Sequence, residues 1–311
     1  MSATSHRSPQ TGPEDDIRLG GGRPRWLLPV VAVVVVALIA VGLGVKLLGG
    51  GGSDAAAADG SHFSDDFQIA YEADSASERA FLEYLNKDIA PQYGVSITPV
   101  GIGDGNQLDQ ATADGKYIAN IYQHKHWLAQ VVDKTGWKLS ALGPVFQWAY
   151  SMYSEKYSSL DDLPQGATIA LLNDPANTAQ ALWILQRAGK LTFKDGVNPW
   201  EATENDIASN PNAYKFTYID YGAGPRVLPE VDAVIAYNMQ FNAAGIPDSD
   251  RIYAPAAPLE FAGQLVVGTD YLNDPQVATL KKIFFDPQVQ AYLKSNDNPD
   301  LTGQLSPVSS S

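Results

Sequence analysis

Between residues 63 and 301 the sequence alternates short apolar strands with amphipathic helices, and this alternation limits the fold more than any other feature. The segment "DFQIAYEA" is typical of a strand, and "SASERAFLEYLNKDIA" is typical of a helix that begins with a capping box of Ser75 and Glu78. Further on, "TENDIASN" is typical of a short helix. Strands separated by single helices indicate parallel sheets with helices on both faces, so we expect an α/β fold.

A second constraint is the apolar run from Trp26 to Val45, whose 20 uncharged residues match the thickness of a bilayer core. Four arginines precede the run and only Lys46 follows it before the next segment, which places the N-terminus in the cytoplasm. We therefore expect a cytoplasmic tail over 1–25 and a single-pass transmembrane anchor over 26–48. The bulk of the chain would lie outside the cell membrane. A cleaved signal peptide is the alternative.

The remaining chain divides into a linker, a folded region and a tail. Residues 49–62, "GGGGSDAAAADGSH", contain no core-forming side chains and are typical of a flexible linker. The folded region then runs over 63–301, and residues 302–311 are expected to form a short tail.

Composition excludes several classes of function. A net charge of −14 provides no basic surface for the phosphates of nucleic acid. With no cysteine, the sequence has no disulfide, catalytic thiol or lipid-modified cysteine. The glycines of "GIGDGN" lack the third glycine of a dinucleotide site, and neither a P-loop nor a G-x-S-x-G motif occurs. His124 and His126 are two residues apart, which favours a polar pocket wall or a solvated loop over a metal site. We expect no metal, no cofactor and no enzymatic activity.

The stretch "NDPANTAQALWILQ", residues 173–186, predicts a strand end that turns into a helix. Asn173 or Asp174 would cap this helix and Pro175 would begin it. The free N–H groups of such a helix end can hold a small anion. A basic residue would complete an anion site, but the first turns offer Asn177 and Gln180 instead.

Three long stretches, in order, are similar to one protein family. They are "ADGKYIANIYQHKHWLAQ", "YSEKYSSLDDLPQGATIALLNDPANTAQALWILQRAGKLTFKDGV" and "PRVLPEVDAVIAYNMQF". The first resembles the family's A-N-aromatic-aromatic-Q-H-K pattern, and the second its S-L-(D/E)-(D/E)-L, G-A and N-D-P-x-N patterns. This resemblance, over residues 65 to 270, is to the NlpA-type methionine-binding lipoproteins, the substrate-binding components of bacterial ABC importers.

The resemblance implies a two-lobed periplasmic-binding-protein fold of type II-like architecture, which closes over a ligand in the cleft between its lobes. Lobe one would comprise 63–148 and 256–301, and lobe two 149–255. The ligand-binding residues that the resemblance implies are Tyr122, His124, Phe146, Trp148, Asn177, Gln180 and Asn238.

Two positions depart from the family pattern where the ligand's head group would bind. The family usually has an arginine at the position of Gln180, where it pairs with the ligand's carboxylate, and an asparagine at the position of Ala236. Replacing a charge-assisted contact by a neutral one would cost a free carboxylate roughly 1.5–3 kcal/mol. The alternative is that Arg226 or Lys125 restores the charge.

The expected function is therefore a membrane-anchored substrate-binding protein of an ABC importer, with an ABC permease in the same membrane as its partner. Its ligand would be methionine or a related compound with a modified head group. The alternative is a solute-binding fold that serves as a sensor, as a protein-interaction domain without transport, or as an enzyme.

Overall fold

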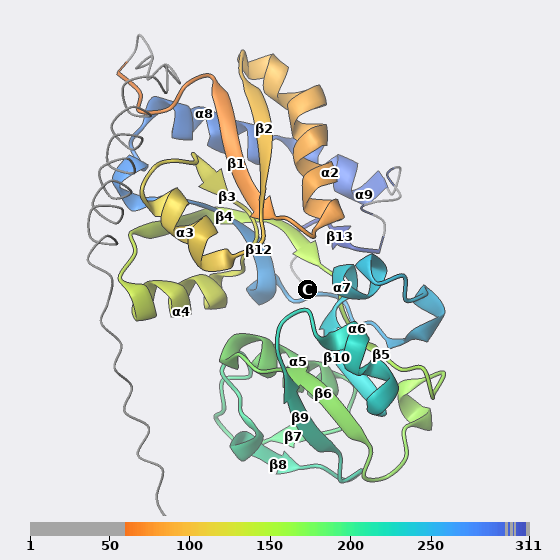
Figure 1. Ribbon diagram of the computed structural model, residues 1–311. Coiled ribbons are helices and arrows are strands. Elements are labelled where there is room, and N and C mark those ends of the chain that lie inside the picture. Colours follow the sequence, from red (N-terminus) through yellow and green to blue (C-terminus); the bar gives the residue numbers. More distant parts are fainter. Residues whose placement is uncertain (1–59, 296–297, 299–300, 302, 309–311) are drawn as a thin grey trace, which may run out of the picture. The chain divides into compact units, whose positions relative to one another are not determined.

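The computed structural model describes residues 60–295, 298, 301 and 303–308 (Figure 1). Two separate sheets, each accompanied by helices, form two lobes, which confirms the predicted α/β two-lobed fold. The predicted anchor at Trp26–Val45 lies outside the described residues. Within the described ranges, no helix has the length and apolar character needed to cross a membrane.

The first lobe is built on a six-stranded sheet with the strand order β13-β4-β12-β3-β1-β2. Its strands are β1 (Asp66–Glu72), β2 (Ser96–Ile102), β3 (Ala119–Asn120), β4 (Leu139–Trp148), β12 (Ala262–Gly268) and β13 (Leu305–Ser306). Its helices are α2 (Ala76–Tyr84), α3 (Gly105–Ala113), α4 (Lys125–Thr135), α8 (Pro275–Phe284) and α9 (Pro287–Ser295). All seven residues of β12 are buried, as expected for a strand inside a sheet.

The second lobe is built on a five-stranded sheet with the order β11-β5-β10-β6-β9. Its strands are β5 (Tyr150–Tyr153), β6 (Thr168–Leu172), β9 (Lys215–Ile219), β10 (Ala233–Tyr237) and β11 (Arg251–Tyr253). Its helices are α5 (Pro175–Arg187), α6 (Gly224–Val227) and α7 (Asn238–Ala243), and a small ribbon pairs β7 (Thr192–Phe193) with β8 (Ile207–Ser209).

Both sheets are mixed, so the prediction of parallel sheets was only partly right. β1 pairs in parallel with β2 and β3, and β6 pairs in parallel with β9 and β10. The strands nearest the two chain crossings run the other way: β12 is antiparallel to β3 and β4, and β5 is antiparallel to β10. A chain that leaves one sheet and later returns to it enters without a crossover helix, and such a strand can pair antiparallel.

The ends of the folded region differ from the sequence prediction. Leu305 is buried and pairs with Trp148 in the sheet, so a tail that begins at residue 302 was wrong for this strand. At the other end, Ser61 belongs to the predicted linker but is buried, and its hydroxyl donates to Asp274 at 2.5 Å. The hydrophobic burial of Leu305 and the side-chain bond of Ser61 fix these residues to the first lobe.

Two local predictions also need correction. Ser75 caps α2 by accepting the N–H of Glu78 at 3.2 Å, but the Glu78 carboxylate binds the N–H of Glu72 and not that of Ser75. The capping box is therefore only half formed. The segment predicted as helical near residue 203 is a single turn over Glu204–Asp206 followed by the strand β8. Thr203 caps the start of this turn, and the turn ends at Ile207, which is extended and pairs with Phe193.

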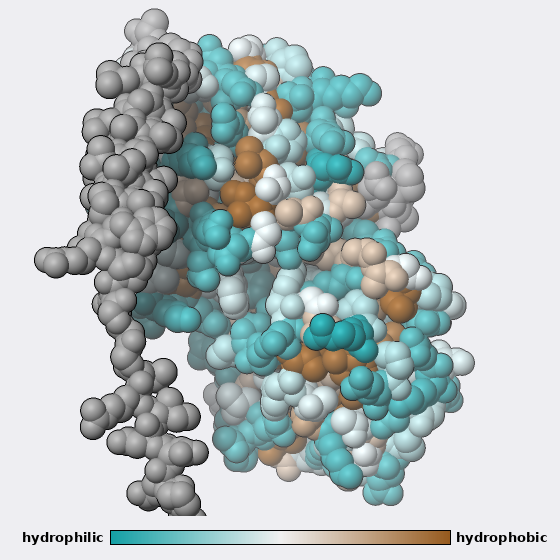
Figure 2. Space-filling model, viewed as in Figure 1, coloured by the Kyte–Doolittle hydropathy of each residue, from teal (hydrophilic) through white to brown (hydrophobic). Residues whose placement is uncertain are grey.

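The described surface is largely hydrophilic on the face drawn in Figure 2. On the face shown in Figure 2, apolar surface is confined to small areas among hydrophilic residues. The cores instead collect the apolar faces of the sheets, and Phe67, Ile69, Leu171 and Ile235 are fully buried.

Candidate binding site

A cavity of about 240 Å³ lies where strands of both sheets end. The first lobe contributes Glu72 at the end of β1 and Trp148 at the end of β4; the second contributes Tyr237 at the end of β10 and the first turn of α5. One buried water needs only about 10–15 Å³, so the cavity can hold a small organic molecule. Ligands of open α/β sheets bind at the carboxyl ends of strands, which makes this cavity the candidate site.

Aromatic side chains form much of the cavity wall, and they are Tyr122, Trp127, Trp148, Tyr221 and Tyr237. The rings of Trp148 and Tyr237 meet edge to face with centroids 5.9 Å apart, and the Tyr221 ring lies 6.1 Å from Tyr237. Trp148 belongs to the first lobe and Tyr237 to the second, so the wall spans both lobes. Such faces suit apolar or sulphur-containing groups and cations.

The N-terminus of α5 reaches the cavity, but its own residues already satisfy it. Asp174 caps the helix: one carboxylate oxygen accepts the backbone N–H of Asn177 at 2.9 Å and the other accepts its side-chain amide at 2.8 Å. The Asn177 oxygen in turn accepts the hydroxyl of Tyr237 at 2.8 Å. The amide at this helix end therefore joins the Asp174 cap to the second lobe's aromatic wall. The helix end already faces a carboxylate.

Glu78 is a fully buried carboxylate on the cavity wall. One of its oxygens accepts the backbone N–H of Glu72 at 3.1 Å, and the other accepts the indole N–H of Trp148 at 3.2 Å. Burial, with the charge of Glu72 nearby, raises the pKa of Glu78 well above its ordinary value. Neutral N–H donors thus hold this group in place without a balancing positive charge.

Glu72 lines the same side of the cavity and accepts the hydroxyl of Tyr221, from the second lobe, at 2.9 Å. Burial raises the pKa of Glu72 to about 7, against the opposing effect of the Tyr221 hydrogen bond. Within the described part of the chain, no lysine or arginine lines the cavity. The site is therefore acidic.

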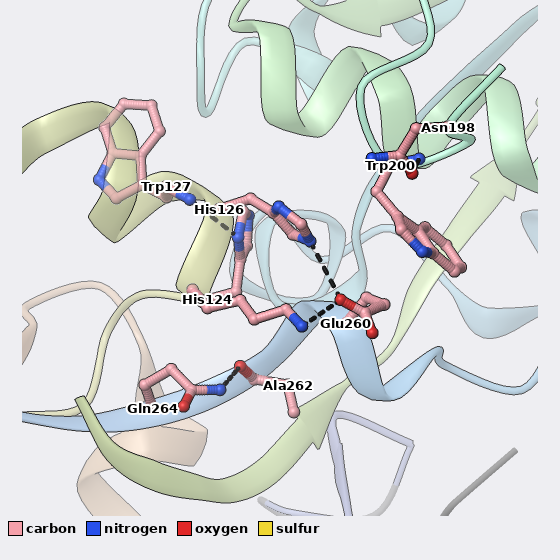
Figure 3. A network of polar contacts seen from close by, with 9 residues as sticks. His124, His126, Trp127, Asn198, Trp200, Glu260, Ala262 and Gln264 are labelled. Carbon is pink, nitrogen blue, oxygen red and sulfur yellow. Dashed lines mark hydrogen bonds and ion pairs between the residues drawn. The ribbon is translucent and has the colours of Figure 1, made fainter. Parts of the chain in front are cut away.

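His124 caps α4 and lines the cavity (Figure 3). Its Nδ1 accepts the backbone N–H of Trp127 at 3.1 Å, so the proton of the neutral ring lies on Nε2. Burial, followed by the neighbouring His126, lowers the pKa of His124 to about 3 although the Asn177 side chain acts in the opposite direction. The ring is neutral at physiological pH, and Nε2 has no hydrogen-bond partner of normal geometry among the described residues.

Lys125 and His126, the two residues after His124, contact Glu260 and not the cavity. Lys125 forms an ion pair with Glu260, and the His126 ring nitrogen lies 3.4 Å from the same carboxylate (Figure 3). Neither side chain lines the cavity. Among the residues that the structure describes, no three histidine, aspartate or glutamate side chains gather as a metal site.

Tyr122 is fixed by a buried polar group beneath the cavity. Its hydroxyl donates to the Asp109 carboxylate on α3, and it also lies 3.2 Å from the carbonyl of Gly105. Asp109 further accepts the side-chain amides of Gln123 at 2.5 Å and Asn120 at 3.2 Å. Burial raises the pKa of Asp109 to about 6 against these hydrogen bonds. The network orients both Tyr122 and Gln123 at the cavity wall.

The structure brings four of the residues predicted from sequence to the cavity: Tyr122, His124, Trp148 and Asn177. Phe146 does not line it. The Phe146 ring is fully buried between Phe81 and Trp148, with centroid distances of 5.3 and 4.9 Å. It also lies so close to Gly263 that a Cβ there would clash. Phe146 is thus part of the core.

Gln180 and Asn238 do not line the cavity either. Gln180 follows Asn177 by almost one turn of α5 and is 2% exposed, and its side-chain oxygen has no hydrogen-bond partner among the described residues. The Asn238 amide donates to the carbonyl of Gly303 at 3.1 Å, which ties it to the C-terminal strand region. Arg226 is exposed and also lies outside the cavity lining.

Sequence reasoning missed several residues of the wall, above all Glu72, Glu78, Tyr221 and Tyr237. One signal was available: Glu72 and Tyr237 are the last residues of their strands, where ligands of α/β folds bind. Glu78 gave no such signal, because its position in the first turn of a helix is explained by capping alone.

Comparison with known proteins identifies the family. Residues 73–305 match the NlpA lipoprotein family. The chain belongs to this family. Among relatives of this NlpA family chain, outer membrane lipoprotein 2 of Mannheimia haemolytica is 32% identical over 213 residues, which cover 68% of this chain and 77% of the relative. The D-methionine-binding lipoprotein MetQ of Salmonella typhi is 32% identical over 197 residues, covering 62% and 72%.

Solved structures of NlpA-like proteins share the fold. A nutrient binding protein from Burkholderia cenocepacia bound to methionine has a TM-score of 0.65 and 30% identity, covering 77% of this chain and 98% of that one. An ABC transporter periplasmic substrate-binding protein from Coxiella burnetii has a TM-score of 0.66 and 28% identity, covering 76% and 97%. These relatives are described as binding proteins, which agrees with the prediction that the chain is not an enzyme.

Proposed function

We propose that this chain is the substrate-binding subunit of an ABC importer and captures a small amino-acid-like ligand in the cavity between its lobes. The observation that carries the proposal is an aromatic-lined cavity at the carboxyl ends of both sheets, in a family with methionine-binding relatives. A 240 Å³ cavity favours ligand capture over a filled cleft that serves only protein contacts.

The ligand is methionine or a related compound with a modified head group. The aromatic wall of Tyr122, Trp127 and Trp148 supports the apolar or sulphur-containing body. The changed head group is supported by the missing positive charge: Gln180 stands where the family usually has arginine, and Lys125 is paired with Glu260. We assign ligand contact to the four predicted residues that line the cavity.

The chain is held at the membrane by Trp26–Val45, with residues 1–25 in the cytoplasm and the binding domain outside. The 311 residues contain no cysteine that could carry the lipid of the family's name, and the apolar run has the length of a membrane span. A tether keeps the binding domain near its permease and raises its effective concentration there. The part of the predicted linker that precedes Ser61 would provide the reach.

The two lobes would move against each other during capture. We assign 63–148 and 256–301 to lobe one and 149–255 to lobe two, with β13 added to lobe one. The Tyr221–Glu72 hydrogen bond and the Trp148–Tyr237 ring contact join the lobes across the cavity. Closure would tighten these contacts around a ligand.

A thermal-shift screen of the full chain in lipid nanodiscs tests the proposal. Amino acids and their amides, esters and amines should include one class that stabilises the protein, by about 2.7 kcal/mol at a concentration of 100 Kd. Two half-buried tryptophans provide a matched pair of variants, because both pack against the cluster around Leu128 but only Trp127 lines the cavity. Trp127→Ala should abolish the ligand-induced shift, and Trp137→Ala should retain it. A screen in which no small molecule stabilises the protein would refute the proposal.

A further inference from the structure

We propose that the ligand carries a protonated amine and no free carboxylate, and that its second polar group is a neutral acceptor such as an amide or ester carbonyl. This inference rests on the proposed function and names the substrate class of the same site. Four independent features of the cavity support it: its charge, its aromatic faces, its occupied helix end and its unpartnered polar atoms.

Charge is the first feature. Glu72, Glu78 and Asp174 line the cavity, and among the described residues no lysine or arginine lines it with them, while the lining residue His124 is neutral. The two glutamates accept hydrogen bonds from an amide N–H, an indole N–H and a phenol, none of which carries a charge. Glu78 is fully buried and Glu72 is half-buried, and carboxylates that lose water without gaining a positive partner are costly. A ligand cation would supply that partner, whereas a ligand carboxylate would add to the repulsion.

The aromatic faces are the second feature. Trp148 donates its N–H to Glu78, and Tyr221 donates its hydroxyl to Glu72, so each acid lies beside a ring of the cavity wall. Tyr237 contacts both of these rings. The face of an aromatic ring attracts a cation, most strongly where water is excluded. Rings and carboxylates placed together therefore form a site for an ammonium group.

The third feature is the helix end that the sequence suggested for an anion. Both oxygens of Asp174 bind N–H groups of Asn177, at 2.9 and 2.8 Å. The positive end of the α5 dipole is thus already compensated by a side chain of the same helix. With no lysine or arginine among the described residues of the lining, a ligand carboxylate would find neither a free helix end nor a cation.

Two buried polar atoms of the lining residues are the fourth feature. The side-chain oxygen of Gln123 and Nε2 of His124 have no hydrogen-bond partner of normal geometry among the described residues, and each residue is only 2% exposed. Buried polar groups are normally paired, so both atoms point to a ligand. The Gln123 oxygen accepts, which suits an ammonium; the His124 Nε2–H donates, which suits a neutral carbonyl oxygen.

Proton linkage provides a separate signature of a cationic ligand. The groups that face Glu72 are Asp74 two residues after the end of β1, Glu78 on α2, Tyr122 before α4, Tyr221 after β9 and Tyr237 on β10. None of these groups is a cationic side chain that could offset the effect of burial, so the pKa of Glu72 stays raised at about 7. An ammonium ligand favours the ionised carboxylate and releases a proton on binding. Affinity should therefore rise from pH 6 to pH 8.

Calorimetry of the full chain in nanodiscs tests the inference with three probes that share the methionine side chain: L-methioninamide, L-methionine and N-acetyl-L-methioninamide. The first has an amine without a carboxylate, the second has both, and the third has neither. We expect L-methioninamide to bind at least tenfold more tightly than either of the others and to release protons at pH 7. Glu72→Gln should reduce this preference tenfold or more. Glu83→Gln, which changes an exposed glutamate on the neighbouring helix α2, should not.

The outcomes separate the inference from the proposed function. L-Methionine or the acetylated amide binding as tightly as L-methioninamide would overturn the cationic ligand and leave a substrate-binding protein in place. Failure of every amine, amide and amino acid to bind would overturn both. The comparison of the three probes uses the unmodified protein, so it stands even if Glu72→Gln does not fold.

Discussion

Replacing Glu72 by glutamine should stabilise the ligand-free protein at high pH and change little at low pH. The folded state raises the pKa of Glu72 from 4.5 to about 7, chiefly by burial. A carboxyl group whose pKa is raised on folding contributes stability below pH 4.5 and loses that contribution as pH rises through 7. Glutamine cannot ionise, and its oxygen can still accept the Tyr221 hydroxyl.

The magnitude follows from the same shift. A change from 4.5 to about 7 corresponds to at most roughly 3.5 kcal/mol at about 1.4 kcal/mol per pKa unit. Partial solvent access at Glu72 and the coupled charge of Glu78 reduce this, so we expect a gain of about 1–3 kcal/mol at pH 8.5. Below pH 4.5 the two proteins should be equally stable.

Thermal unfolding of both proteins in detergent, at half-unit steps from pH 4.5 to 8.5, measures the difference directly. The Tm of the variant should exceed that of wild type by an amount that grows between pH 5 and 7 and is constant above pH 7. Glu83→Gln serves as the control, because that side chain is 62% exposed and should show no pH-dependent difference. A Glu72→Gln protein that is less stable than wild type at pH 8.5 would refute the view that this carboxylate is uncompensated.

Three further changes test other parts of the structure. Gly263→Ala should destabilise the protein by about 1–3 kcal/mol in thermal unfolding, because the Phe146 ring occupies the space of the new methyl group. The control Gly103→Ala should be neutral, because a methyl group at that position meets no neighbour. Equal effects of the two substitutions would contradict this packing. Gln180→Arg tests whether a longer, charged side chain reaches the cavity that Gln180 itself does not line: L-methionine should then bind at least tenfold more tightly in calorimetry, about 1.4 kcal/mol, and an unchanged Kd would show that this position does not set the ligand. Asp174→Ala should cost about 1 kcal/mol of stability through loss of the α5 cap, and a neutral result would contradict the capping role.

The sequence predicted the positions of elements better than it predicted the orientation of side chains. Asp174 and Pro175 mark the start of α5 correctly because capping is a local effect that adjacent residues determine. Strand direction depends on which distant segment pairs with which. The antiparallel entry of β12 beside β4 could therefore not be inferred from alternation alone.

For the site residues too, the sequence indicated the element on which a residue lies but not the direction of its side chain. Phe146 and Trp148 alternate on β4 and look equivalent in sequence, but Trp148 is the last residue of the strand and reaches the cavity, while Phe146 packs against Gly263. Glu78 is explained locally as part of a cap, and only the tertiary contact with Trp148 shows that it faces the cavity. Contacts between lobes, such as Tyr221 with Glu72, have no local signal.

The most direct measurement is a crystal structure of the protein grown with L-methioninamide. We predict density for one ligand in the cavity, with its amine about 2.7–3.2 Å from the carboxylate of Glu72 or Glu78 and its thioether against the aromatic wall. Density for the ligand at another place, or in the cavity with its amine turned away from both glutamates, would contradict the proposed site.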